Sequence, residues 1–172
     1  MDRTGGVPVI VEVRPDLDEA LARSLLAVQR AAYALEAALI GDDRIPPLHE
    51  TLADLRAASL HWLAAFTRQP AGGDAAGRAD VRPVLVGAIA WAEDGTTLDI
   101  DRLVVDPAAH RRGVGRALVG AALTRAGARR VLVATGRTNE PARRLYESLN
   151  FTSLGDEEVI PHLWITRYAR PA

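Results

Sequence analysis

The residues whose types and spacing most clearly suggest a functional site lie in one short segment in the second half of the chain. An apolar stretch ends at Val105, and the segment HRRGVG (110–115) follows it, directly before a run with helical spacing. Glycine-rich loops that precede a helix bind phosphate groups, because backbone N–H groups and the positive end of the helix dipole point at the anion. Arg111 and Arg112 could add planar donors to such a site. The segment therefore predicts a loop that binds a phosphate or a pyrophosphate.

Phosphate-binding loops differ in their spacing, and two well-known designs do not fit this one. A P-loop requires G-x-x-x-x-G-K-[ST], and the chain contains no lysine. A dinucleotide fingerprint requires G-x-G-x-x-G/A directly after a strand. Here Leu118 occupies the third small position, and seven residues separate Val105 from Gly113. A longer basic loop that wraps a pyrophosphate in front of a helix is the design that remains.

The charge distribution suits a compact anionic ligand better than nucleic acid. The whole chain has a formal net charge of −1, which argues against a general nucleic-acid-binding protein. Residues 102–144 contain ten arginines and two acids, a net charge of +8, whereas the rest of the chain carries −9. This concentration favours a polyanion as ligand, although any single arginine could equally cover a solvent-exposed helix face.

The composition excludes several kinds of functional site and indicates the number of domains. The chain contains no cysteine, which excludes disulfides, thiolate metal sites and a cysteine nucleophile. His49, His61 and His162 have no metal-ligand spacing, so no metal site is expected. With 172 residues, 48% of them hydrophobic, we expect one domain over residues 1–172.

Neither a membrane span nor a secretory signal is expected. The most apolar run of the N-terminal part, residues 17–40, is interrupted by Arg23, Arg30 and Glu36. The first six residues, MDRTGG, lack the apolar core of a secretory signal. A cytoplasmic protein without membrane contact is therefore the expectation.

The elements that must position the loop can be predicted from periodicity and turn residues. In the N-terminal half the patterns predict a strand (7–13), a helix from Leu17 to about Leu39 capped by Asp16 and Glu19, a loop (41–47) and a second helix (48–59). Residues 61–66 could extend that helix or form a strand. Residues 68–80 predict a flexible connection at a hairpin tip.

The C-terminal half has the stronger signals. Two strands (83–94 and 96–105) joined at Asp94-Gly95 precede a helix (114–126), a buried strand (129–136), a helix (142–149) and two final antiparallel strands. Pro141 is expected in the first turn of the last helix, with Asn139 or Glu140 as its cap. The order β-α-α-β-β-β-α-β-α-β-β predicts an α/β fold with a mixed sheet and helices packed on it.

In its element order and in two local motifs, the sequence resembles the GNAT superfamily of N-acetyltransferases. HRRGVG (110–115) is similar to the family's acetyl-CoA loop, Q/R-x-x-G-x-G/A, and TGRTNEPARRLYESLNF (135–151) is similar to N-x-x-A-x-x-L-Y-x-x-x-G-F. Two positions depart from the pattern: His110 replaces Gln or Arg, and Asn150 replaces glycine. Asparagine tolerates left-handed backbone angles better than other non-glycine residues, so the second departure is mild.

The resemblance implies a GNAT-like acyl-CoA N-acyltransferase fold that uses acetyl-CoA as the acetyl donor. The pyrophosphate would be bound by backbone N–H groups of the loop, and the pantetheine arm would pair with the edge of the preceding strand. Asn139 would contact the cofactor or bound water, or would only cap its helix. The residues expected to bind the cofactor are Leu103, Val104, Val105, His110, Arg111, Arg112, Gly113, Val114, Gly115, Arg116, Asn139, Ala142 and Arg143.

Tyr146 is the first candidate for the chemistry, since the matching tyrosine of related enzymes protonates the departing sulfur. A thiol has a reference pKa of about 8.5 and a phenol about 10, so a positioned phenol can hydrogen-bond and protonate a leaving thiolate. The alternative is that Tyr146 only belongs to the apolar stripe of its helix. Both interpretations fit the spacing of Leu145, Tyr146 and Leu149.

Asp99 and Asp101 are the candidates for a general base. An amine with a pKa near 10 must lose a proton before it attacks, which costs about 4 kcal/mol at pH 7. If the strand is regular, both aspartates lie on one face, opposite Ile100 and Arg102. The alternatives are solvation at the hairpin edge or an ion pair with Arg102.

The acceptor is expected between the loop at 41–49 and the final hairpin, beside the second helix and Trp62. It would be a small-molecule or peptide amine, and the acids of these segments hint at a cationic one. Those acids are Asp42, Asp43, Glu50, Asp156, Glu157 and Glu158. Final hairpins in such folds often pair subunits, so a homodimer is possible. A non-catalytic domain that senses acyl-CoA is the alternative function.

Overall fold

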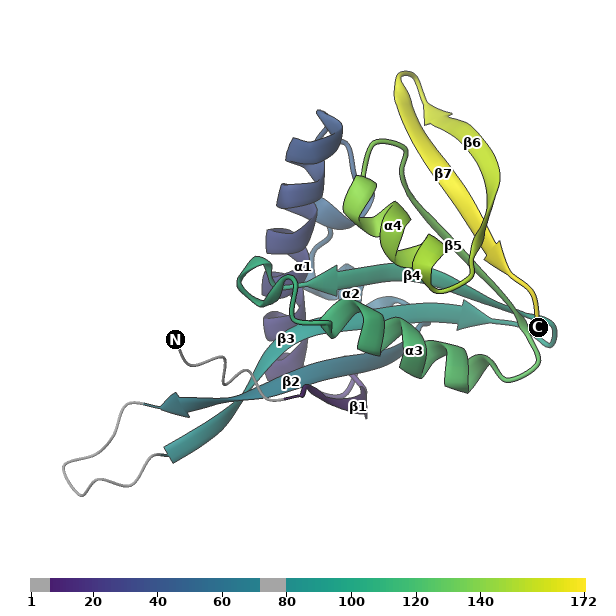
Figure 1. Ribbon diagram of the computed structural model, residues 1–172. Coiled ribbons are helices and arrows are strands. Elements are labelled where there is room, and N and C mark those ends of the chain that lie inside the picture. Colours follow the sequence, from purple (N-terminus) through teal and green to yellow (C-terminus); the bar gives the residue numbers. More distant parts are fainter. Residues whose placement is uncertain (1–6, 72–79) are drawn as a thin grey trace.

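The computed structural model describes residues 7–71 and 80–172, which form a mixed sheet with helices on both faces (Figure 1). Its elements are β1 (Val9–Val13), α1 (Glu19–Ile40), η1 (Pro46–Leu48), α2 (Leu52–Ala57), β2 (His61–Ala71), β3 (Asp80–Glu93), β4 (Thr97–Val105), η2 (Pro107–Ala109), α3 (Val114–Ala126), β5 (Arg130–Gly136), α4 (Glu140–Ser148), β6 (Thr152–Ile160) and β7 (Leu163–Arg170). The order of helices and strands predicted from the sequence is confirmed. Within the described residues, no helix is long and apolar enough to cross a membrane.

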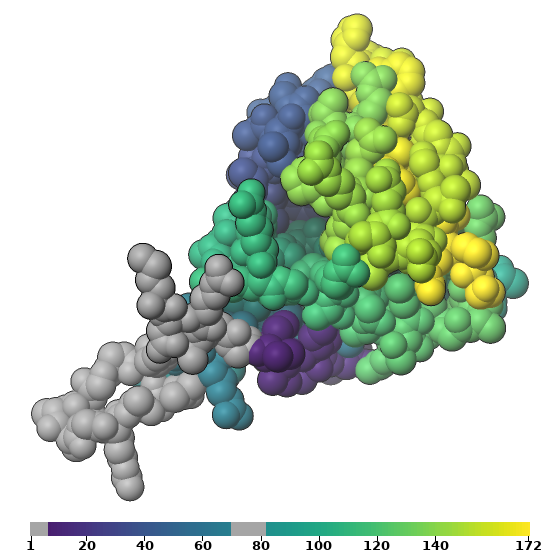
Figure 2. Space-filling view, viewed as in Figure 1, coloured from purple at the N-terminus to yellow at the C-terminus, as the bar shows by residue number. Residues whose placement is uncertain are grey.

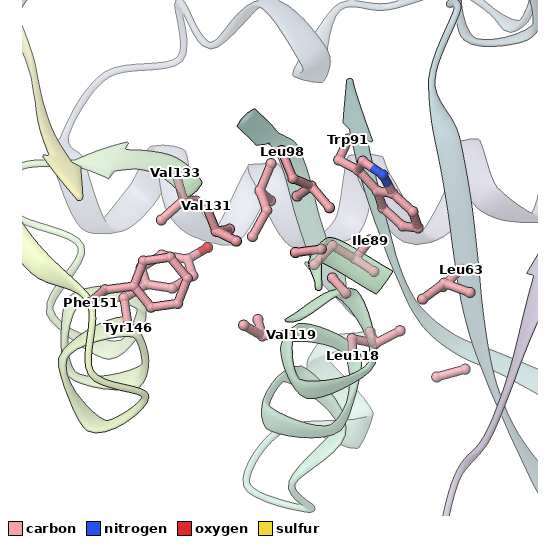
Figure 3. Packing of buried hydrophobic residues seen from close by; sticks show 14 of the residues in the cluster. Leu63, Ile89, Trp91, Leu98, Leu118, Val119, Val131, Val133, Tyr146 and Phe151 are labelled. Carbon is pink, nitrogen blue, oxygen red and sulfur yellow. The ribbon is translucent and has the colours of Figure 1, made fainter. Parts of the chain in front are cut away.

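Two apolar layers hold the helices on the sheet. The sheet order is β1-β2-β3-β4-β5-β7-β6. On one face, side chains of α3 and α4 such as Leu118 and Tyr146 pack against Ile89 and Val133 (Figure 3). On the other face, α1 and α2 pack against residues such as Ala88 of β3. The sheet is therefore buried on both sides at its centre.

The centre of the sheet opens between β4 and β5. These parallel strands pair only over Thr97–Ile100 and Arg130–Val133. Beyond Ile100, β5 continues to pair with β7 on its other side, and the two strands diverge (Figure 1). In the described chain, no strand pairs with the remaining part of β4 on the side that faces β5. The backbone from Asp101 to Val105 is thus a free strand edge inside the molecule.

A β-bulge at Asp101 changes which side chains of β4 face which layer. Ala90 of β3 pairs with Arg102 and Trp91 pairs with Ile100, so Asp101 is the extra residue. Ile100 lies in the layer of α3, whereas Val104 lies in the layer of α1. The expected regular alternation, with Ile100 and Arg102 on one face, was therefore wrong. The bulge shifts the alternation by one residue.

Three N-terminal predictions also need correction. The cap of α1 is Asp18, whose side chain accepts a hydrogen bond from the Leu21 N–H at 3.0 Å, whereas Asp16 pairs with Arg14. The second helix begins only at Leu52, because Thr51 and Asp54 form a capping box there. Of the two alternatives for residues 61–66 the strand is confirmed, but β2 extends to Ala71 and β3 begins at Asp80. The expected connection is therefore shorter than predicted, and its central part, 72–79, lies outside the described residues.

α4 begins two residues earlier and ends one residue earlier than predicted, but the residues that flank it behave as expected. Asn139 is its cap and accepts a hydrogen bond from the Ala142 N–H at 3.3 Å. Asn150 adopts a left-handed conformation with φ of +65°. The Phe151 N–H donates back to the Tyr146 carbonyl at 3.1 Å, which closes the helix end. The chain therefore turns directly after the helix that carries Tyr146.

Candidate active site

Two adjoining cavities lie where β4 and β5 separate. The first, here called the loop cavity, has a volume of about 660 Å³ and lies between α1, the end of β4, the loop before α3, and α4. The second, here called the hairpin cavity, has about 370 Å³ and extends from β4 and β5 toward the β6–β7 hairpin. Figure 2 shows the molecule hollowed between α1, the loop before α3 and α4. The two cavities share the lining residues Tyr33, Glu36, Leu103, Asn139 and Ala142.

The loop before α3 presents the donors of an anion site. Arg111 and Gly113 have positive φ angles, +60° and +78°, which turn the chain sharply into the helix. No side chain caps α3, and its first intrahelical bond is donated by Ala117 to the Gly113 carbonyl. The N–H groups that precede Ala117 thus lack a helical partner, and residues 113–116 line the loop cavity.

Most residues expected to bind the cofactor lie around this cavity. Its lining includes Leu103, Val105, His110, Arg111, Gly113, Val114, Gly115, Arg116, Asn139 and Ala142. His110 donates from Nε2 to the Val105 carbonyl at 3.1 Å and so ties the loop to the end of β4. Arg116 donates to Ser148 Oγ at 2.7 Å, which links the loop to α4.

Three of the expected residues lie outside the lining. Val104 points into the layer of α1 because of the bulge. Arg112 is exposed. Arg143 donates to the Tyr168 hydroxyl at 3.1 Å and to the Arg137 carbonyl at 2.9 Å, away from the cavity. Its neighbour Arg144 lines the cavity instead.

Tyr146 projects from α4 into the hairpin cavity and is only 3% exposed. Its ring packs against Phe151 and Tyr168, with ring centroids 5.6 Å and 5.9 Å away (Figure 3 shows the first pair). Burial raises the pKa of Tyr146 well above its usual value, and the charge of Glu36 adds to this effect. The phenol is therefore a neutral donor at ordinary pH.

The structure separates the two aspartates proposed as bases. Asp101 lines the hairpin cavity and accepts a hydrogen bond from Arg102 Nε at 2.6 Å. Asp99 is not part of either lining, and partial burial raises its pKa, opposed by the charge of Arg167. Of the pair, only Asp101 is placed to contact a molecule in the cavities.

The acids expected around the acceptor lie elsewhere. Glu50 accepts from Arg102 Nη1 at 2.5 Å behind β4, and Arg102 lies 5.5 Å from the centre of the Trp62 ring. Neither Glu50 nor Trp62 lines either cavity, whereas the loop at 41–49 and the final hairpin, between which the acceptor is expected, both line the hairpin cavity. The other acids are paired on the surface or point away: Asp42 with Arg44, Asp156 with Thr166, Glu157 with Arg167 and Glu158 with the His162 N–H, and Asp43 is exposed.

The sequence-based site lacked two residues of α1. Tyr33 and Glu36 line both cavities. Glu36 Oε1 accepts from the Gly136 N–H at 3.3 Å and from Thr135 Oγ1 at 3.4 Å, so it bridges α1 to the end of β5. The sequence contains one indication of these residues. Tyr33, Glu36 and Ile40 share a helix face by their spacing, which places a carboxylate on a face that otherwise packs.

Comparison with known proteins identifies the family. The model of the acetyltransferase (GNAT) family matches residues 33–151, which include the loop before α3 and all of α4. The chain belongs to the GNAT family. This GNAT chain is 35% identical over 109 residues to the UPF0157 protein YqkA of Bacillus subtilis; the match covers 63% of the chain but only 28% of YqkA. The family resemblance stated from the two motifs is thus confirmed.

Solved structures show the same GNAT fold. A GCN5-related N-acetyltransferase from Rhodopseudomonas palustris superposes with a TM-score of 0.67 at 18% identity, over the full length of both chains. The PaiA N-acetyltransferase from Thermoplasma acidophilum, solved in complex with coenzyme A, superposes with a TM-score of 0.65 at 15% identity, over 94% of this chain and 98% of PaiA. At these identities the likeness establishes the fold and not the acceptor.

Proposed function

We propose that this protein transfers an acetyl group from acetyl-CoA to an amine by direct attack in a ternary complex. The observation that carries the proposal is that the two cavities meet. The uncapped start of α3 and the free edge of β4 line one cavity, and Tyr146 lines the other. A ligand bound at its phosphates by the loop can therefore reach Tyr146 along β4.

The residues around the loop cavity fit coenzyme A. Its volume of about 660 Å³ lies in the range of ligand pockets. The helix N-terminus and Arg111 suit a pyrophosphate, and the free edge of β4 can pair with the amides of the pantetheine arm. Leu35 and Leu39 of α1 are 39% and 48% exposed and line the same cavity, where an aliphatic ligand would cover them.

Bound acetyl-CoA would supply the acetyl group as a thioester. The transfer forms a C–N bond and breaks the C–S bond, while the amine loses a proton and the sulfur gains one. Tyr146, kept protonated by burial, is the proposed donor to the sulfur. Asp101 is the proposed proton acceptor because it lines the hairpin cavity and Arg102 fixes its carboxylate.

The cofactor site can be tested with two glycines of α3. Gly115 lines the loop cavity, and a Cβ there would lie 3.3 Å from Leu145 Cδ2, whereas a Cβ on Gly120 would meet nothing within 4 Å. Calorimetry with coenzyme A should give micromolar-scale affinity for the parent and for Gly120→Val, and at least about tenfold weaker binding for Gly115→Val, since roughly 1.4 kcal/mol of lost contact suffices for that factor. Absence of binding by the folded parent would contradict the proposal. Binding without thiol release from acetyl-CoA with any amine would point to an acyl-CoA sensor instead.

A further inference from the structure

The hairpin cavity has apolar walls on both sides. Ile45, Pro46 and Pro47 come from the segment after α1, and Val159, Leu163 and Ile165 come from the β6–β7 hairpin. Val159 sits at a β-bulge of β6, where the register shifts between Glu158 and Ile160. Although 41% exposed, its side chain lines the cavity. The side chains of these two walls are therefore hydrocarbon and offer no hydrogen-bonding groups.

The segments that form the two walls are joined by a hydrogen bond outside the cavity lining. Arg44 is paired with Asp42, and its Nη2 donates to the Pro161 carbonyl at 3.0 Å, 117 positions further along the chain. This bond fixes the tip of the β6–β7 hairpin against the segment that contains Pro46 and Pro47. A bound molecule therefore meets a formed cavity of about 370 Å³, near the lower end of the usual range for ligand pockets.

Glu36, Asp101 and Arg102 are the charged side chains among the described residues that line the hairpin cavity, and Glu36 has no cationic partner among them. Arg102 is bonded to Glu50, Gln29 and Asp101. Asp101 and Glu50 thus share the single positive charge of Arg102. Glu36 accepts only from the neutral groups of Gly136 and Thr135, and in the described part of the chain no arginine or histidine forms an ion pair with it. A cationic ligand would supply the missing partner.

Resting on the proposed function, we propose that the acceptor is a compact apolar monoamine. Its ammonium group would pair with Glu36 at the junction of the cavities, and its aliphatic or aromatic body would fill the space between Pro46 and Val159. A second ammonium group, as in a polyamine, or the hydroxyl groups of an aminoglycoside would be placed against walls that cannot hydrogen-bond them, which disfavours both classes.

A homologous series of amines tests the apolar walls. With acetyl-CoA saturating, kcat/KM should rise about fourfold for each CH₂ from ethylamine to n-pentylamine, which corresponds to about 0.8 kcal/mol per buried CH₂. The decisive pair is n-pentylamine and 1,4-diaminobutane, because they have similar length and differ mainly at the far end. We expect at least about tenfold preference for n-pentylamine; equal rates or a preference for the diamine would overturn the proposal.

Matched variants test the residues. Glu36→Gln retains an acceptor for the Gly136 N–H but loses the charge, so it should raise KM for n-pentylamine at least about tenfold, whereas Asp43→Asn, an exposed acid outside the hairpin cavity, should not. Val159→Asn should lower the preference for n-pentylamine, whereas Ile160→Asn, which changes its neighbour outside the lining, should leave it. If both members of either pair behave alike, the assigned residue is wrong.

Binding measurements separate this inference from the proposed function. Calorimetry of n-pentylamine and 1,4-diaminobutane with the coenzyme A-saturated protein gives the preference even if turnover is slow. No binding of n-pentylamine to that complex would overturn the inference alone. No binding of coenzyme A would overturn the proposed function, and the same amine titration on the free protein would then still report whether the hairpin cavity takes an apolar amine.

Discussion

Tyr146 and Tyr168 are two buried phenols in ring contact, and the structure predicts opposite consequences of removing their hydroxyl groups. Among the hydrogen bonds of the described residues, none involves the Tyr146 hydroxyl, and Tyr146 lines the hairpin cavity. The Tyr168 hydroxyl accepts from Arg143 Nε and donates to Glu147 Oε1, both at 3.1 Å, and lines neither cavity. Tyr146→Phe should therefore change activity and Tyr168→Phe should change stability.

The expected magnitudes follow from these contacts. Loss of a general acid lowers the rate by about 10² to 10⁴, so kcat of Tyr146→Phe should fall by at least about a hundredfold, while the free energy of unfolding changes by less than about 1 kcal/mol. Tyr168→Phe loses two hydrogen bonds worth about 0.5–1.5 kcal/mol each. Its free energy of unfolding should fall by about 1–3 kcal/mol, and its kcat should stay within about threefold of the parent.

The assay combines thiol release from acetyl-CoA in the presence of n-pentylamine with urea unfolding of the same three proteins. Because burial raises the pKa of Tyr146, its hydroxyl stays protonated in the folded protein from pH 6 to pH 9, and the rate ratio of parent to Tyr146→Phe should be constant over that range. A Tyr146→Phe protein with a rate within twofold of the parent would remove this phenol from the mechanism. A ratio that changes steeply with pH would contradict its assignment as a neutral acid.

Two further predictions concern the charges behind and beside β4. Glu50→Gln removes the charge facing Arg102, whose side chain is 6% exposed. It should cost about 3 kcal/mol in urea unfolding, near the lower end for a broken buried pair, because Asp101 still pairs with Arg102. Arg23→Gln breaks an exposed pair and should leave the urea midpoint of the parent unchanged. Asp99→Asn should raise the melting temperature at pH 7. The raised pKa of Asp99 means that folding favours its protonated form, so the gain should disappear as the pH falls below its ordinary value of about 3.9, and a gain that persists at pH 3 would contradict this cause.

The elements could be predicted where the signal is local. The helix 114–126 has the predicted bounds, because a glycine precedes it and apolar residues recur at helical spacing up to Ala126. The cap of α4 and the left-handed Asn150 likewise follow from neighbouring residues. The cap of α1 was misplaced because two acids, Asp16 and Asp18, both suit a cap. Arg14 pairs with the first, and the second caps the helix.

The site was only partly predictable because its walls come from segments far apart in the sequence. The loop at 110–116 and Tyr146 belong to contiguous motifs, so spacing reveals them. Glu36 is held at the cavity by a hydrogen bond from the Gly136 N–H, a hundred positions away. Gly136 allows α1 to approach this closely, because a Cβ there would lie 2.7 Å from Ile40 Cγ2. Such a close approach of α1 to β5 depends on the strand order. A helical stripe alone does not show which of its residues face a cavity.

The bulge at Asp101 connects the fold to the chemistry. One extra residue in β4 shifts the alternation, so Arg102 turns behind the strand, where Glu50 and Gln29 bind it, and Leu103 lines both cavities. Pairing with β5 ends at the residue before the bulge. The same irregularity therefore frees the strand edge proposed to receive the pantetheine arm, and holds the Asp101 carboxylate at the cavity through Arg102. A regular β4 would direct Arg102 into the apolar layer of α3, away from Glu50 and Gln29. Because Arg102 bonds both Glu50 and Asp101 at the bulge, we expect Glu50→Gln to weaken coenzyme A binding in calorimetry as well as stability.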